Sequence, residues 1–180
     1  MDLIKIFSIL ILLLNIFFLC FFAALILKIL FKKSFLFERI IRFIRGREAK
    51  LALSISLLAT LGSLYLSEIR GFVPCVLCWY QKIFMYPIPV LLGVFMYKKL
   101  SEVFSYILPL SFIGMLIAAY HYYLQINPHP LIPCSAIGFS VSCSERFFNF
   151  GYITIPWMSF SAFAFVACLC FLREKVKEKE

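Results

Sequence analysis

Five long apolar runs constrain the fold of this chain more than any other feature of its sequence. They cover residues 6–27, 51–69, 79–97, 103–124 and 152–172. A transmembrane helix needs about 20 mainly apolar residues to cross about 30 Å of hydrocarbon, and each run is close to that length. The connecting segments are too short to build a separate water-soluble core. The sequence therefore predicts an all-α integral membrane protein folded as one compact helical bundle.

The composition supports this fold class and argues against a nucleic-acid-binding protein. Of the 180 residues, 63% are apolar and 18% are aromatic, far from the mixture typical of soluble domains. The net charge is +9, but the basic residues gather at the ends of the apolar runs. That placement is typical of topology signals and of contact with anionic membrane lipid.

The lysine and arginine distribution predicts how the chain crosses the membrane. Fourteen of the 18 basic residues lie in residues 28–50, at Lys98 and Lys99, and in the C-terminal tail. These segments fall on one side if all five runs span, and the positive-inside rule makes that side cytoplasmic. We therefore expect an outside N-terminus and a cytoplasmic C-terminus.

Two segments in the N-terminal 50 residues have their own predictions. The first run, residues 6–27, is too long for a signal-peptide core, so we expect a real span there. In the basic segment after it, four apolar residues share one helical face and three arginines another: Phe37, Ile40, Ile41 and Ile44 against Arg39, Arg42 and Arg45. This pattern predicts an amphipathic helix on the membrane surface, with a plain basic loop as the alternative.

Two cysteine pairs lie on the predicted extracytoplasmic side. Cys75 and Cys78 form a C-x-x-C before the third run, and Cys134 and Cys143 lie in a turn-rich segment before the last. Disulfides persist in that oxidising compartment, and two dithiols within reach of each other pass a disulfide along by thiolate attack. The pairs therefore indicate a redox relay. The other three cysteines lie inside apolar runs and receive no role: Cys20, Cys168 and Cys170.

Non-redox uses of the same cysteines remain open at this point. Four thiolates suit zinc, although the spacing does not match a zinc ribbon or knuckle. A soft-metal binder would use Cys75 and Cys78 with His121 or His129. A structural protein with two static disulfides is the simplest alternative.

A relay must end in an electron acceptor, and a C-x-x-C at the mouth of a span is placed to meet a quinone dissolved in the bilayer. Lys82 lies four residues after Cys78, one helical turn on, where its charge would stabilise a thiolate and bind a quinone oxygen. His121, at the same membrane face, would donate a proton or a hydrogen bond to the quinone. The alternatives are a snorkelling lysine and an ordinary interfacial histidine. Proline at 87 and 89 should kink the third run.

Three motifs together resemble one known family. PCVLCWYQK, AAYHYYLQINPHPLIPC and FGYITIPWMSFSAFAF are similar to the disulfide bond formation protein B family (DsbB), particularly its BdbC-like branch. The resemblance implies a four-helix transmembrane bundle over residues 51–172. Residues 1–50 would add an extra N-terminal transmembrane helix with a basic amphipathic cytoplasmic linker, and residues 173–180 a charged cytoplasmic tail.

The resemblance also implies an activity and site roles. The family reoxidises a thioredoxin-fold partner of the DsbA type at the bacterial inner membrane and passes the electrons to ubiquinone or menaquinone. By this likeness Cys134 forms the mixed disulfide with the partner, Cys143 exchanges with Cys75, and Cys78 contacts the quinone near His121. No resident metal is expected.

The chain departs from the family pattern at the expected quinone site and in the second cysteine loop. Lys82 stands where the family usually has arginine, which keeps the charge but lacks the planar fork. The loop from Cys134 to Cys143 is shorter than in the best-known members. A quinone-linked reductase of the vitamin K epoxide reductase type is the second enzyme hypothesis. Those enzymes place the C-x-x-C late in the bundle, whereas here it follows the first helix of the matched core.

Overall fold

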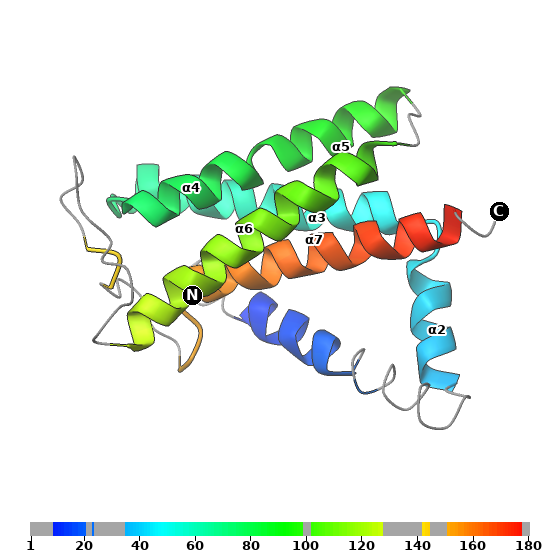
Figure 1. Ribbon diagram of the computed structural model, residues 1–180, viewed down its shortest axis with the longest axis horizontal. Helices are drawn as coiled ribbons and strands as arrows, with labels where there is room; N and C mark the ends of the chain where they lie inside the picture. Colours follow the sequence, from blue (N-terminus) through cyan, green and yellow to red (C-terminus); the bar gives the residue numbers. More distant parts are fainter. Residues whose placement is uncertain are drawn as a thin grey trace. The chain divides into compact units, whose positions relative to one another are not determined.

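A computed structural model describes residues 9–20, 23, 35–98, 102–127, 142–144 and 151–177. Within these ranges every regular element is a helix (Figure 1). The chain divides into two compact units, Met1–Glu48 and Ala49–Glu180. The first contains a short apolar helix, Ile9–Cys20, and α2, Phe35–Ile44. The second contains most of α3 (Glu48–Leu64), then η1 (Tyr65–Ile69), α4 (Val76–Met85), α5 (Pro87–Lys98), α6 (Val103–Ile126) and α7 (Ile155–Lys177).

Helix α2 has two distinct faces, as its sequence predicts. Ile44 is buried and Ile40 and Ile41 are half-buried, whereas the three arginines of the opposite face are exposed. The segment is therefore a helix and not a plain basic loop. Of the predicted first span, residues 6–27, the structure describes 9–20 and 23, and the remainder lies outside the described residues.

Three helices in the described part of the chain are long and apolar enough to cross a membrane. They are Glu48–Ile69, which joins α3 to η1, then α6, and Ile155–Glu174 of α7. Large apolar side chains of α3 remain exposed at Leu57, Leu58 and Leu61, as expected of a surface that faces lipid. The chain is therefore a helical membrane protein.

The third apolar run forms two helices that meet at Tyr86. The backbone N–H of Tyr86 still donates to the carbonyl of Lys82 at 2.9 Å, and Pro87 then begins α5. Proline has no N–H to continue the ladder and its ring restricts the preceding turn, so the helix is interrupted there. The predicted disturbance at the proline pair is confirmed. Neither half alone is long enough to span.

Helix α6 is the centre of the second unit. It packs along α7 and also contacts α4 and α5 (Figure 1). Gly114 makes the closest approach possible, because the ring of Phe163 occupies the space that a Cβ atom would need. Helix α3 is joined to the junction of α4 and α5 through a hydrogen bond of 3.3 Å from the Tyr86 hydroxyl to the Ser63 hydroxyl.

The end of the α3 span brings the chain to the C-x-x-C. The last turn widens to a π-helix, in which the N–H of Arg70 donates to the carbonyl of Tyr65 at 3.0 Å. Gly71 follows with φ of 67°, a conformation that side chains with a Cβ rarely adopt. This turn redirects the chain toward Cys75, at the start of α4.

Candidate functional site

The C-x-x-C lies where the loop after Gly71 becomes helix α4. Cys75 is the N-cap residue, and its carbonyl accepts from the backbone N–H of Trp79 at 3.1 Å. Because the cysteines are three residues apart across the first helical turn, their sulfurs face each other at 3.3 Å. Both thiols are free; Cys75 is buried and Cys78 half-buried.

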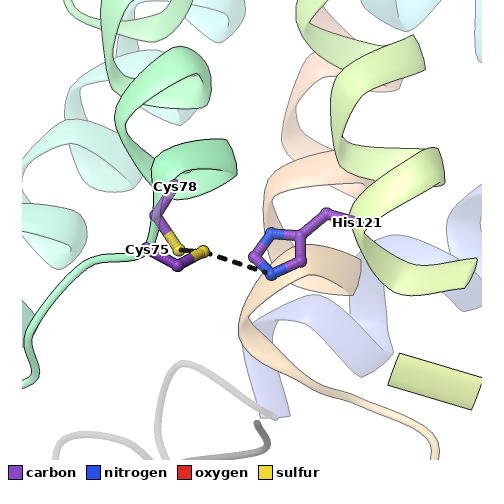
Figure 2. A group of neighbouring side chains, drawn as sticks. All are labelled: Cys75, Cys78 and His121. Carbon is purple, nitrogen blue, oxygen red and sulfur yellow. Dashed lines mark hydrogen bonds between the residues drawn. The ribbon is translucent and has the colours of Figure 1, made fainter. Parts of the chain in front are cut away.

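His121 reaches this dithiol from the opposite helix. It lies near the C-terminal end of α6, is only 2% exposed, and points its Nε2 atom at the Cys75 sulfur, 3.6 Å away (Figure 2). His121 therefore contacts the C-x-x-C directly, and the membrane face on which both lie stays a prediction.

The same imidazole nitrogen also contacts the second cysteine segment. Nε2 of His121 lies 3.1 Å from the backbone carbonyl of Cys143, which is 1% exposed and disulfide-bonded. Cys75 and Cys143 belong to one buried cluster with Leu124. His121 thus connects segments that lie far apart in the sequence.

The other ring nitrogen of His121 has a partner on α4. The side-chain nitrogen of Gln81 lies 2.9 Å from Nδ1, and the Gln81 side chain is 5% exposed. Gln81 falls on the buried side of α4, with Met85 one turn later. Helix α4 therefore contributes both a reactive sulfur and a polar contact to the histidine.

The surroundings of Cys75 favour its thiolate. The hydrogen bond with Cys78 lowers the pKa of Cys75 to about 4, with the His121 imidazole acting in the same direction and burial opposing both. The two sulfurs share protons as a pair, so the low value describes the first proton lost from the dithiol. A thiolate at physiological pH is the form that attacks disulfides.

Lys82 extends toward η1, whereas the preceding residue, Gln81, contacts His121 of α6. Its ammonium donates to the Ser67 hydroxyl at 3.0 Å and lies 5.1 Å from the centre of the Trp79 ring. Ser67 is held in turn by the carbonyl of Ser63 at 3.2 Å, within the π-helical turn.

The structure brings four of the six predicted site residues to one end of the second unit around α4 and α6: Cys75, Cys78, His121 and Cys143. Lys82 is on the same helix as the dithiol but contacts Ser67 and Trp79. Cys134 lies outside the described residues, as does His129 of the soft-metal alternative.

Sequence reasoning missed Gln81 and Ser67. An amide three residues after Cys78 in an otherwise apolar helix is a detectable signal, because a polar side chain there needs a partner. Nothing in the sequence indicates that this partner is His121.

Aromatic packing holds α6 and α7 together at this same end. The ring of Trp157 lies 4.9 Å from Tyr122 and 5.8 Å from Tyr152, and the Tyr122 hydroxyl donates to the Tyr152 carbonyl at 3.1 Å. These contacts fix the part of α6 that carries His121.

The arrangement supports thiol–disulfide exchange or the binding of a soft metal. The sulfurs of Cys75 and Cys78 and a ring nitrogen of His121 all lie within 4.8 Å of one another, close enough to ligate one ion. For exchange, the site offers a dithiol in which the Cys75 thiolate is stabilised, beside the disulfide-bonded Cys143.

A stabilised dithiol next to a disulfide-bonded cysteine, at one end of a bundle of apolar helices, is typical of a membrane thiol–disulfide oxidoreductase. Comparison with known families agrees with this class. The family described as "Disulfide bond formation protein DsbB" matches residues 47–173, and the chain belongs to that family. The resemblance seen in the sequence motifs is thereby confirmed.

Individual relatives carry related names. The chain is 41% identical to disulfide bond formation protein C of Bacillus subtilis (strain 168), covering 69% of this chain and 91% of that protein. It is 43% identical to probable disulfide formation protein C 1 of Bacillus anthracis, covering 73% of this chain and 99% of the relative. A probable disulfide formation protein of Chlamydia pneumoniae is 38% identical over 76% of this chain and 98% of its own length. No solved structure gives a significant match.

Proposed function

We propose that this chain is a quinone-dependent protein thiol oxidase that reoxidises an extracytoplasmic thioredoxin-fold partner of the DsbA type. The observation that carries the proposal is the position of His121, whose Nε2 lies within hydrogen-bonding reach of both the Cys75 sulfur and the Cys143 carbonyl. The two cysteine segments are adjacent, as a disulfide relay requires.

The electron path begins with exchange between proteins. A thiolate of the partner attacks Cys134, and the partner leaves as a disulfide while Cys134 and Cys143 become thiols. Cys143 then attacks Cys75 of the Cys75–Cys78 disulfide, so the bond between Cys143 and Cys75 forms as Cys78 leaves with the electron pair. Attack by Cys134 on Cys143 restores their disulfide and releases Cys75. The free dithiol beside disulfide-bonded Cys143 corresponds to this product state.

The dithiol of Cys75 and Cys78 must then give up two electrons and two protons. A bound quinone supplies the two-electron acceptor. The donor set beside Cys78 fits a quinone, because Lys82 offers a cationic hydrogen-bond donor and Trp79 and Tyr80 offer half-exposed aromatic surface. Lys82 would bind an oxygen. The two ring nitrogens of His121 already contact Gln81 and the Cys143 carbonyl. His121 would therefore influence quinone reduction through its contact with Cys75.

The proposal includes an organisation in the bacterial inner membrane. Residues 51–172 form the four-helix bundle, with α4 and α5 together as one kinked span. Residues 1–50 add an extra N-terminal span and a basic amphipathic linker in the cytoplasm, and residues 173–180 form a cytoplasmic tail. Both cysteine pairs then face the extracytoplasmic side.

Cysteine substitutions test the catalytic proposal. Cys75→Ser and Cys78→Ser should each abolish reduction of decylubiquinone or menadione by the purified protein supplied with a reduced DsbA-type protein. The matched control is Cys168→Ser, because this cysteine lies in α7, away from the relay. Full turnover by either of the first two variants would reject the scheme.

Binding of a soft metal is the second candidate function, favoured by the close approach of Cys75, Cys78 and His121. Protein purified without chelator would then contain one ion per chain, and would not reduce quinone. The reductase alternative uses the same sulfurs in the opposite direction. In that case the protein, supplied with a reduced quinone as electron donor, would reduce the disulfide of the partner.

A further inference from the structure

The contacts of His121 determine which of its ring nitrogens carries the proton. A backbone carbonyl has no hydrogen to give, so the 3.1 Å contact between Nε2 and the Cys143 carbonyl is a hydrogen bond only when Nε2 is protonated. In the neutral ring, Nδ1 then presents a lone pair. The Gln81 side-chain nitrogen, 2.9 Å away, donates to that lone pair.

Because His121 and Gln81 are both buried, the wrong tautomer of the ring would leave hydrogen-bonding groups without partners. His121 is 2% exposed and Gln81 is 5% exposed, so neither side chain can exchange its partner freely for bulk water. A buried ring of the other tautomer would place two lone pairs, on Nε2 and on the Cys143 oxygen, against each other. With the Gln81 amide oriented as in the structure, its nitrogen toward the ring, it would also leave an amide hydrogen facing the N–H of Nδ1.

We propose that Gln81 is a positioning residue that fixes His121 in the tautomer with the proton on Nε2, and thereby holds the Cys143 backbone beside the Cys75 sulfur. The Nε2 proton lies between two acceptors, the Cys143 oxygen at 3.1 Å and the Cys75 sulfur at 3.6 Å. The contact of Gln81 is with His121 and not with Cys75 or Cys143. Gln81 therefore acts on the two cysteine segments through the imidazole ring.

The step served by this arrangement is the internal exchange, and in that respect the inference rests on the proposed function. When Cys143 attacks the Cys75–Cys78 disulfide, one S–S bond forms and one breaks, and no outside oxidant is consumed. The carbonyl bond restrains the Cys143 segment near Cys75 before the attack. The same N–H then stabilises Cys75 when it is released as a thiolate.

Nitrogen NMR of the histidine ring tests the proton placement directly. The full-length protein is prepared in detergent with ¹⁵N-histidine, and the two histidine signals are distinguished with His129→Gln. We expect His121 to show protonated Nε2 and unprotonated Nδ1. Gln81→Leu should give a mixture of tautomers, and Gln81→Glu should protonate Nδ1 as well as Nε2, because an acceptor, a carboxylate or a carbonyl, then faces each ring nitrogen. A wild-type ring protonated on Nδ1, or ring shifts unchanged in Gln81→Leu, would overturn the inference.

Exchange kinetics test the consequence. Oxidised protein is mixed with dithiothreitol, quenched with acid, alkylated, and analysed by mass spectrometry for the Cys75–Cys143 disulfide. Loss of one buried hydrogen bond should slow its appearance about tenfold in Gln81→Leu. Gln125→Leu is the matched control, since it makes the same change at a second buried glutamine, on α6. An equal loss in both variants would mean general disruption and would contradict a positioning role for Gln81.

The two measurements separate this inference from the function on which it draws. If wild-type protein never forms the Cys75–Cys143 disulfide but shows the expected ring shifts and their change in Gln81→Leu, the exchange scheme fails while the tautomer assignment stands. If exchange is fast and unaffected in Gln81→Leu, the inference fails and the oxidase scheme stands.

Discussion

Cys75 combines burial with a stabilised negative charge, which is unusual for a thiol. Its pKa is lowered from 9.0 to about 4, first by the hydrogen bond with Cys78 and then by His121. Because the thiolate is the charged form of an acid with a lowered pKa, it persists as the pH falls until about pH 4. Any stability it contributes is present above pH 9 and is lost as the pH falls through about 4.

We therefore expect the rate at which Cys75 in the reduced protein reacts with iodoacetamide to change little from pH 8 down to near its lowered pKa of about 4. Peptide mass spectrometry identifies the alkylated residue at each pH. His121→Ala should move the profile to higher pH, because one hydrogen bond to the thiolate is lost. A rate that rises only near pH 9 would contradict the assignment.

Lys82, held by its hydrogen bond to Ser67, is the proposed ligand of a quinone oxygen. Lys82→Met should lower quinone reduction by roughly a hundredfold, as removal of a donor to a developing anion does in other enzymes. Ser67→Ala should have a smaller effect, about fivefold, because the ammonium keeps its charge but loses its 3.0 Å contact with the hydroxyl. Steady-state kinetics with decylubiquinone measure both. Lys82→Arg should keep most of the activity, and Lys98→Met, at the exposed end of α5, serves as control.

Helix α6 is the element on which the site depends, because it carries His121 and packs on α7, α4 and α5. Its close approach to α7 requires Gly114, where an added Cβ would collide with the Phe163 ring. Gly114→Ala should lower the free energy of unfolding by about 1–3 kcal/mol, the usual cost of overpacking a filled interface. Thermal unfolding in detergent measures the change.

The matched control for that substitution is Gly93→Ala in α5. A Cβ atom there meets no heavy atom within 4 Å, and alanine favours helix by up to about 1 kcal/mol over glycine. Gly93→Ala should therefore be neutral or stabilising. Equal destabilisation by both substitutions would show that glycine is needed for a reason other than α6–α7 packing.

The whole molecule has two units, and the DsbB family match begins at residue 47. We expect a chain that lacks residues 1–46 to insert into membranes and to keep its thiol oxidase activity, because the described site contacts all lie within Ala49–Glu180. Quinone reduction per folded molecule is the measurement. Inactivity of a normally inserted truncated protein would assign the N-terminal unit a part in the reaction.

The orientation in the membrane is also a property of the whole molecule. Fourteen of the 18 basic residues would lie on the cytoplasmic side in the proposed topology. After mild reduction of intact cells, an impermeant maleimide should label Cys134 but not a cysteine introduced by Glu180→Cys. Labelling with the opposite pattern would place the relay in the cytosol and end the oxidase proposal.

The sequence by itself determined three of the five predicted membrane helices, the C-x-x-C and the family. Apolar run length is a one-dimensional property, and hydrogen bonding within a helix makes it sufficient to predict α6 and α7. The break at Tyr86 also follows from local chemistry, since Pro87 lacks an N–H.

Only the tertiary structure decided how the polar side chains pair. Gln81 and His121 are 40 residues apart, and His121 and Cys143 are 22 apart, so no local pattern joins them. Their contacts arise because α4 and α6 pack side by side and leave buried polar atoms that must find partners. For the same reason the contact of Lys82 with Ser67 depended on how the end of the α3 span meets α4.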